Sequence, residues 1–336
     1  MVNLIRFKVL AQVALLSLSG LTSCSVFALD CGLIKSVNNT EKGIHSARLS
    51  SSNLLQRIDE ITFDGEMAGR LVQSIALDSR KCSWVAAVSL SKNPSSVLLA
   101  EFAYSQPGGS YKLYQSDTLF SHPQDISASL WGDKTLFWLP SQDGLGVTGF
   151  TLNDEAIHEE FHFELFNRPV KGITTAVDGG GKYLAVQGGF AGGQGRRQMV
   201  RVYDLQQLMN RKETLSMKSV EPVYEWPLDG AQQDKKQWRQ GMAIYGDSLF
   251  ILSGNAKPSQ EKLLINYKLD GEVISIEFLP SNLLLGFKMR RSKTFEPEGL
   301  EIMSYNGKVG LAMGLAGGTK SNRSYELWFV PLKRDK

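Results

Sequence analysis

The sequence has few of the residues that build metal centres, and its apolar runs are short. Its 336 residues include 3 cysteines and 4 histidines, without the CxxC or Cys/His spacing of a zinc site. The longest apolar run, Val9 to Leu18, falls short of the about 20 residues that a membrane-spanning helix needs. We therefore expect a mature protein without a transmembrane segment, soluble or tethered by lipid.

Signatures of common enzymes and of nucleic-acid-binding proteins are also missing. The chain has no Gly-x-Ser-x-Gly nucleophile elbow, no phosphate-binding loop and no His-Glu-x-x-His helix. Its 37 basic and 34 acidic residues leave a net charge of +3, without the clustered basic stripe that binding to nucleic acid requires. These absences favour a protein that is not an enzyme and has no nucleic acid partner.

The N-terminus has the pattern of a secretory signal. Arg6 and Lys8 precede the apolar run, and small and turn-forming residues follow it. This order of basic, apolar and small segments is typical of a signal peptide over residues 1–28. We therefore expect export to the periplasm or the medium.

Two processing sites compete, and they decide the fate of the cysteines. Val26-Phe27-Ala28 fits ordinary cleavage before Leu29, which we favour, whereas Leu21-Thr22-Ser23-Cys24 resembles a lipobox in which Cys24 is acylated. Either cut leaves Cys31 and Cys82 as an even pair. In an oxidising compartment we expect them to form a disulfide, which would stabilise the fold by roughly 3–4 kcal/mol.

Composition and periodicity predict an all-β fold. The chain is rich in glycine (32 residues) and phenylalanine (16 residues), and short alternating strands separated by Gly and Asn/Asp turns recur along it. Helical periodicity is limited to Leu54 to Ile61 and Leu205 to Asn210. Many short strands with regular turns indicate a sandwich, a barrel or a propeller.

An internal repeat decides between these architectures. In each unit a long polar residue precedes a small or short one and then an alternating apolar strand; the units start at Gln73, Gln124, Lys171, Gln240 and Glu298. Propeller blades have four strands and run about 40–50 residues, with insertions enlarging some. We therefore predict a five-bladed β-propeller over residues 67–336, with a β-sandwich as the alternative. Insertions are expected at Gly188 to Gln198 and Lys212 to Lys236, and residues 29–66 form an N-terminal extension that could close the ring.

The C-terminal half carries a family resemblance. The segments Arg239 to Gly254, Phe295 to Ile302 and Gly310 to Gly318, followed by Tyr325-Glu-Leu-Trp, resemble the helveticin J and teichoic-acid-biosynthesis-protein-C-like family. The resemblance is good over residues 168–332 and thin before them. It implies a five-bladed propeller that is secreted or displayed, associated with cell-wall polymers or bacteriocin activity, and it implies no reaction.

The repeat also predicts a site at one mouth of the central channel. The residues that start the innermost strands should form a ring there, and amides, a cation and a carboxylate suit sugar hydroxyls or a phosphate. Alternatively, the same residues could satisfy one another and buried water. We add His122 and Arg239, so the candidate ligand-binding residues are Gln73, His122, Gln124, Lys171, Arg239, Gln240, Glu296 and Glu298.

Glu296 and Glu298 flank Pro297, which should hold the chain extended and aim both carboxylates to the same side. Such a pair could bind calcium or perform general acid/base chemistry, but we favour a structural role. Elsewhere, His158 and His162 alternate with Phe161 and Phe163. This pattern predicts a strand with both histidines on one solvent face, and makes a helical metal site the weaker alternative.

The leading hypothesis is therefore an exported, non-enzymatic propeller that recognises an envelope glycan or polyanionic cell-wall polymer at the channel mouth. A secreted hydrolase of phosphoester or glycoside bonds, using Glu296, Glu298 and His122 with a metal, is the alternative from a different class. A helveticin-like bacteriocin is the third.

Overall fold

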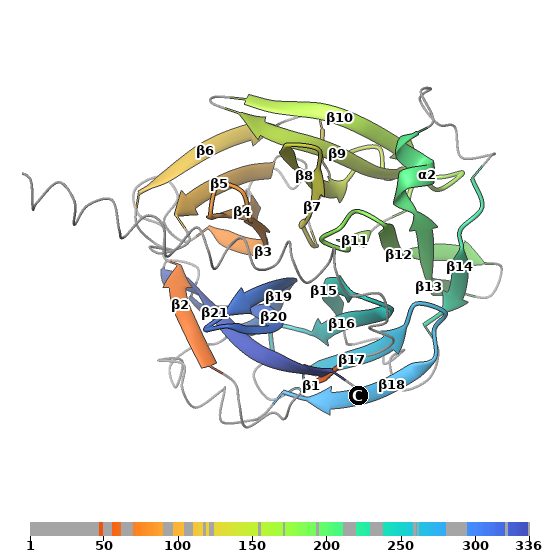
Figure 1. Cartoon of the computed structure of the whole chain (residues 1–336). Helices are drawn as coiled ribbons and strands as arrows, with labels where there is room; N and C mark the ends of the chain where they lie inside the picture. The colour runs from red at the N-terminus through yellow and green to blue at the C-terminus, as the bar shows by residue number, and fades with distance from the viewer. Residues whose placement is uncertain are drawn as a thin grey trace, which may run out of the picture.

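The protein is a five-bladed β-propeller (Figure 1), as the repeat predicts, and the β-sandwich alternative is wrong. Five small antiparallel sheets surround a central axis. The structure is a computed structural model, and it describes residues 47–49, 56–61, 70–89, 97–103, 110–116, 119–120, 124–153, 156–170, 172–192, 195–210, 220–228, 238–257, 260, 262–279, 294–319 and 322–334.

Each of the first four blades is a sheet whose strands follow one another from the axis outwards. Blade 1 contains β3 (Leu71–Asp78), β4 (Ser83–Ser89), β5 (Val97–Ala103) and β6 (Tyr111–Ser116). Blade 2 contains β7 (Ser127–Trp131), β8 (Lys134–Pro140), β9 (Gly146–Asn153) and β10 (Ala156–Glu164). Blade 3 contains β11 (Thr174–Val177), β12 (Tyr183–Gly192), β13 (Gly195–Asp204) and β14 (Tyr224–Pro227). Blade 4 contains β15 (Trp238–Tyr245), β16 (Ser248–Gly254), β17 (Leu263–Lys268) and β18 (Val273–Phe278).

Blade 5 combines the two ends of the described chain. Its inner strands are β19 (Thr294–Tyr305), β20 (Lys308–Thr319) and β21 (Asn322–Arg334). The outer edge of β21 pairs with β2 (Gln56–Ile61) over one part of its length and with β1 (Ala47–Leu49) near its end. The N-terminal strands therefore close the ring by completing the last blade.

The core lies between the blades rather than inside any one of them. Successive side chains of a strand point to opposite faces, so Ile75 packs with blade 5 while the adjacent Ala76 packs with blade 2. Trp84 and Phe329 fill the space between blades 5 and 1, and neither is more than 1% exposed. Because both faces of each sheet are covered, inner strands are apolar on both sides.

Two sequence predictions about segments need correction. Residues Gln56–Ile61 form a strand and not part of a helix, because they pair with the edge of β21. In the glycine-rich segment predicted as an insertion, residues 188–192 and 195–198 belong to two paired strands, in which Gly188 pairs with Met199 and Gly192 with Gly195. The predicted helix at Leu205 is confirmed as α2 (Leu205–Met209), which Asp204 caps by accepting a hydrogen bond from the backbone N–H of Gln207.

The second predicted insertion, residues 212–236, contains the outer strand of blade 3, Tyr224–Pro227, so part of it belongs to the blade. The signal (residues 1–28), Cys24 and Cys31 lie outside the described residues. Export, the lipid tether and the Cys31–Cys82 disulfide therefore stay predictions. No helix in the described part of the chain is long and apolar enough to cross a membrane.

Candidate functional site

Three of the five predicted polar starts lie at β-bulges of inner strands. The pairing shifts between Val72 and Ser74 in β3, between Arg239 and Gly241 in β15, and between Pro297 and Leu300 in β19. A bulge leaves an extra residue outside the ladder and re-aims its side chain. The residues displaced in this way include Gln73, Gln240 and Glu298.

The glycines after Gln240 and Glu298 allow inner strands to meet. A Cβ on Gly299, whose φ is +85°, would lie 2.9 Å from Cα of Ser74 in blade 1. One on Gly241 would lie 2.7 Å from the carbonyl carbon of Gly299. Real side chains avoid such distances to backbone. Glycine at these positions therefore brings β15, β19 and β3 together at the level of the bulges.

The bulge residues are hydrogen-bonded from blade to blade. The side-chain amide of Gln73 donates to Oε1 of Glu298 over 3.4 Å, and that of Gln240 donates to Oε1 of Glu296 over 2.7 Å. Glu296 and Glu298, which we predicted to aim to the same side, have hydrogen-bond partners in different blades. Glu296 pairs with blade 4 and Glu298 with blade 1, because Glu298 belongs to the bulge and leaves the regular alternation.

Burial shifts the acid–base properties of this cluster. It raises the pKa of Glu298 well above its usual range, the charge of Glu296 raises it further, and Arg323 opposes both. Burial also raises the pKa of Glu296, against the attraction of Lys262 and Arg323. Burial lowers the pKa of Lys262 to about 8, and Glu296 opposes this shift. The cluster thus contains carboxyl groups that hold their protons more tightly than usual.

Sequence reasoning missed Asp125, a buried residue of blade 2 that contacts blade 4. Its Oδ2 accepts a hydrogen bond from the backbone N–H of Met242 in blade 4. Burial raises its pKa well above the usual range, while the backbone N–H groups of Met242, Leu300 and Ile126 lower it. The sequence contained one signal for this residue: an aspartate follows Gln124 at the position where the other units have serine or glycine.

Sequence reasoning also missed Glu301, three residues after Glu298 in β19. Burial raises its pKa to about 8, while the N–H groups of Ile302 and Leu77 oppose that shift. Ser127 and Thr174 occupy the same position in their own repeats. Several buried polar atoms of the inner strands, and one of Asp125 just before β7, have no hydrogen-bond partner within the part of the chain that the structure describes: Ser74 Oγ, Asp125 Oδ1, Ser127 Oγ, Thr174 Oγ1, Gln240 Oε1, Glu298 Oε2 and Glu301 Oε2.

The other predicted site residues take different places. His122 and Lys171 lie outside the described residues. Gln124 is half-buried next to Asp125, and Arg239 is half-buried beside Gln240, with its pKa lowered by burial. Within the described chain, Glu296 and Glu298 belong to no group of three converging metal ligands.

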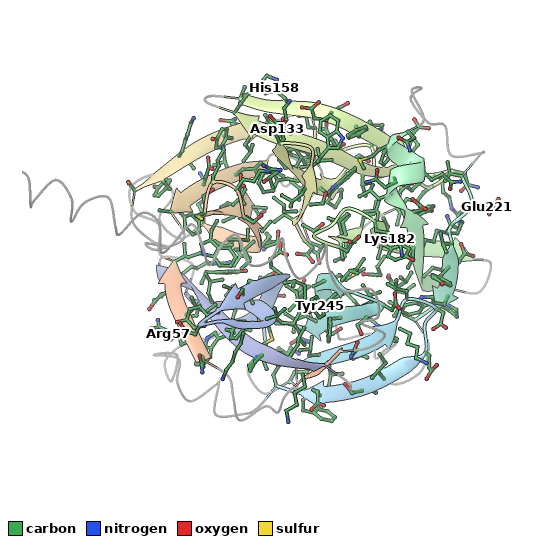
Figure 2. All side chains as sticks on the ribbon, in the orientation of Figure 1. Arg57, Asp133, His158, Lys182, Glu221 and Tyr245 are labelled. Carbon is green, nitrogen blue, oxygen red and sulfur yellow. The ribbon has the colours of Figure 1, made fainter. Side chains whose placement is uncertain are left out.

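The prediction that His158 and His162 share one face of β10 is wrong. The register shifts between Glu159 and Phe161, so His158 is opposite Thr151 while His162 is opposite Thr148. Residues three apart on β9 point to opposite faces, and the two histidines therefore do so too. His158 is exposed at the outer rim of blade 2 (Figure 2).

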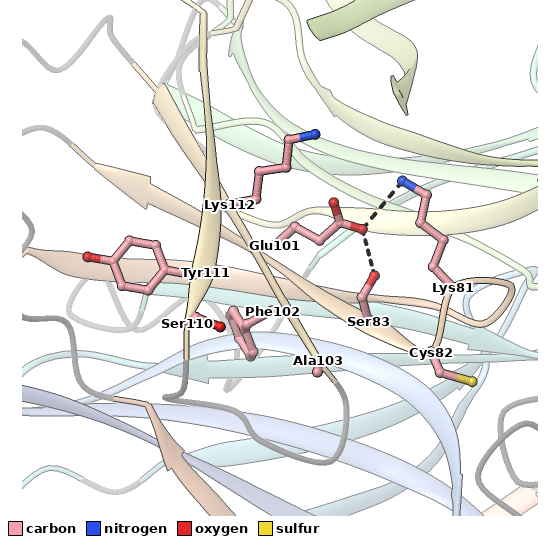
Figure 3. Close-up of a pocket in the computed structure, with 9 residues that line it drawn as sticks. All are labelled: Lys81, Cys82, Ser83, Glu101, Phe102, Ala103, Ser110, Tyr111 and Lys112. Atoms are coloured by element: carbon pink, nitrogen blue, oxygen red, sulfur yellow. Dashed lines mark hydrogen bonds and ion pairs between the residues drawn. The ribbon is translucent and has the colours of Figure 1, made fainter. Parts of the chain in front are cut away.

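A cavity of about 450 Å³ lies on the outer part of blade 1 (Figure 3). Glu101 is central to it and accepts hydrogen bonds from Ser83 (2.8 Å), Tyr114 (2.7 Å) and Lys81 (3.4 Å). These contacts outweigh burial and lower the pKa of Glu101. Both oxygens of this carboxylate are already engaged. The better candidate site is therefore the group of buried and half-buried polar residues around the bulges, which we call the channel cluster: Gln73, Asp125, Gln240, Glu296, Glu298 and Glu301.

No protein family model and no curated protein matches this sequence. Among solved structures, the tail fiber of Staphylococcus aureus phage P68 matches with a TM-score of 0.60 at 17% identity, covering 89% of this chain. This chain spans 56% of the length of that phage protein. A GH43 β-xylosidase/α-arabinofuranosidase from a compost microbial metagenome matches with a TM-score of 0.45 at 10% identity, over 86% of this chain and 98% of the enzyme. At these identities the similarity concerns the propeller fold alone.

Proposed function

We propose that this chain is an exported binding propeller that recognises an envelope glycan or polyanionic cell-wall polymer at the bulged end of its channel. The observation that carries the proposal is the set of bulges in β3, β15 and β19, which gather Gln73, Gln240 and Glu298 with Glu296. The resemblance to the helveticin J and teichoic-acid-biosynthesis-protein-C-like proteins supports the same class of ligand.

The chemistry of the cluster suits a hydroxyl-rich ligand. Amides both donate and accept, and carboxyl groups that retain their protons can also do both. Gln240 Oε1 and Glu298 Oε2 are buried with no partner in the described chain, and buried polar atoms are normally satisfied by protein, water or ligand. Arg323 and Lys262 act on Glu296, so cationic groups that could attract a phosphate lie close by.

The test is binding to an array of glycans and isolated wall polymers by the mature protein and by Gln73→Ala and Gln240→Ala. We expect each substitution to weaken binding about 5- to 10-fold, which corresponds to losing one hydrogen bond of about 1–1.5 kcal/mol. Gln115→Ala, on the outer strand β6, is the matched control. Unchanged binding by both variants, with folding verified by circular dichroism, would place the ligand elsewhere.

A second candidate function, hydrolysis of glycoside or phosphoester bonds, has one observation in its favour. Burial raises the pKa of both Glu296 and Glu298, and a general acid must hold its proton near working pH. The measurement is turnover of chromogenic glycosides and phosphodiesters by the wild type and Glu298→Gln. A wild type without turnover, or a Glu298→Gln variant with full turnover, contradicts the hydrolase.

A further inference from the structure

We propose that blade 2 carries a zinc-binding site formed by Asp143, His162 and Glu164. The site lies on the strand β10 and the turn between β8 and β9, apart from the channel cluster, and is independent of the proposed function. One ligand atom from each residue lies within 4.8 Å of the others. An imidazole with two carboxylates is a ligand set that zinc accepts.

The observed spacing is that of two ligands on one tetrahedral ion. Nε2 of His162 lies 3.3 Å from Oδ2 of Asp143. Two ligands held about 2.0–2.1 Å from a tetrahedral zinc ion lie about 3.3 Å apart. The pair already has the separation of two adjacent zinc ligands.

The imidazole of His162 has a hydrogen-bond partner on its other ring nitrogen as well. The hydroxyl of Thr148 lies 3.3 Å from Nδ1 of His162, the ring nitrogen that does not face the carboxylate. Histidines that bind metal usually donate their second N–H to such a partner, which fixes the tautomer and leaves the other nitrogen for the ion. Thr148 is placed for this role because it pairs directly with His162 across β9 and β10.

The carboxylate of Asp143 is also held in place, by hydrogen bonds within its own turn. Its Oδ1 accepts hydrogen bonds from the hydroxyl of Ser141 (2.6 Å) and the backbone N–H of Leu145 (2.8 Å), while Oδ2 faces His162. The turn is fixed to the chain that follows β10, since Leu145 accepts a backbone hydrogen bond from Leu165 over 2.7 Å. The turn and β10 therefore present their ligands as one unit.

The bulge in β10 creates this arrangement. It reverses the alternation after Glu159, so Phe161 and Phe163 pack towards blade 3 while Ile157 packs on the side of blade 1. His162 and Glu164 point to the face opposite the two phenylalanines, half-buried near the turn that carries Asp143. Calcium is disfavoured because its ligands are oxygens.

The experiment is calorimetric titration of the tag-free mature protein with ZnCl₂, checked by the visible absorption of bound Co²⁺. We expect saturable zinc binding by the wild type. His162→Ala should weaken that affinity at least 100-fold, and Thr148→Val by about 10- to 100-fold. His158→Ala, on the opposite face of the same strand, is the matched control and should bind as the wild type does.

Three results would overturn the proposal: no saturable zinc binding by the wild type, equal affinity in His162→Ala, or an equal loss in His158→Ala. If His162→Ala fails to fold, Glu164→Gln keeps the test open, since it removes charge from a half-buried strand residue with little change in shape. Calcium binding with no zinc binding would also contradict the site. All of these readouts are independent of glycan recognition.

Discussion

At the scale of single residues, the channel cluster is unusual because its carboxyl groups are buried with few ionic partners. Glu301 has its pKa raised to about 8 by burial, although an ordinary glutamate titrates near 4.3. The folded protein therefore binds this proton more tightly than the unfolded chain does. Stability from the neutral group is fully present below the unfolded pKa and is lost as pH rises through about 8.

We accordingly expect Glu301→Gln to flatten the dependence of stability on pH. For the wild type, one such group lowers the free energy of unfolding by about 1.4 kcal/mol for each pH unit between its two pKa values. The amide cannot ionise, so the variant should lose less stability than the wild type from pH 5 to 8. Urea unfolding at four pH values measures both slopes. Parallel slopes would mean that Glu301 is ionised in the folded state.

At the scale of elements, the bulges fix which residues meet at the channel. The repeat identified Gln73, Gln240 and Glu298 as equivalent, and the structure explains the equivalence by a shift of register in each strand. The glycines that follow Gln240 and Glu298 are required by contact between blades. The bulge therefore turns a polar side chain away from the ladder, and the glycine after it leaves room for the neighbouring strand.

Gly299→Ala should destabilise the fold more than Gly132→Ala. Both glycines have positive φ, +85° and +58°, but a Cβ at Gly132 meets nothing within 4 Å, whereas one at Gly299 meets the backbone of Ser74. Both variants suffer left-handed strain of about 1–2 kcal/mol, and crowding adds about 1–3 kcal/mol at Gly299 alone. Denaturant midpoints measure the difference, and equal midpoints would show that the blades separate easily there.

At the scale of the whole molecule, ring closure depends on a strand distant in sequence. β2 covers the edge of β21, and its Ile61 is buried in the core between blades 5 and 1. Arg57 of β2 lies 3.3 Å from the buried Glu326 of β21. Without β2, blade 5 would expose an unpaired edge.

A chain that begins at residue 62 should therefore unfold at lower temperature than one that begins at residue 46, which retains β1 and β2. Losing Ile61 alone corresponds to about 2–5 kcal/mol, the usual cost of truncating a buried isoleucine. A peptide of residues 46–61 added in trans should restore part of the melting temperature. Equal melting temperatures for the two chains would mean that β2 contributes nothing to closure.

The sequence by itself determined the number of blades. The innermost strand of each blade is covered by other blades on both faces, so each of the five repeats the same pattern of polar, small and apolar residues. The sequence also identified Gln73, Gln240 and Glu298. Only the tertiary structure decided their partners, since hydrogen bonds between blades join residues as far apart as Gln73 and Glu298. The same holds for Asp125, Glu301 and the separation of His158 from His162. Long-range burial and a one-residue bulge decide these features, and neither leaves a local periodic pattern in the chain.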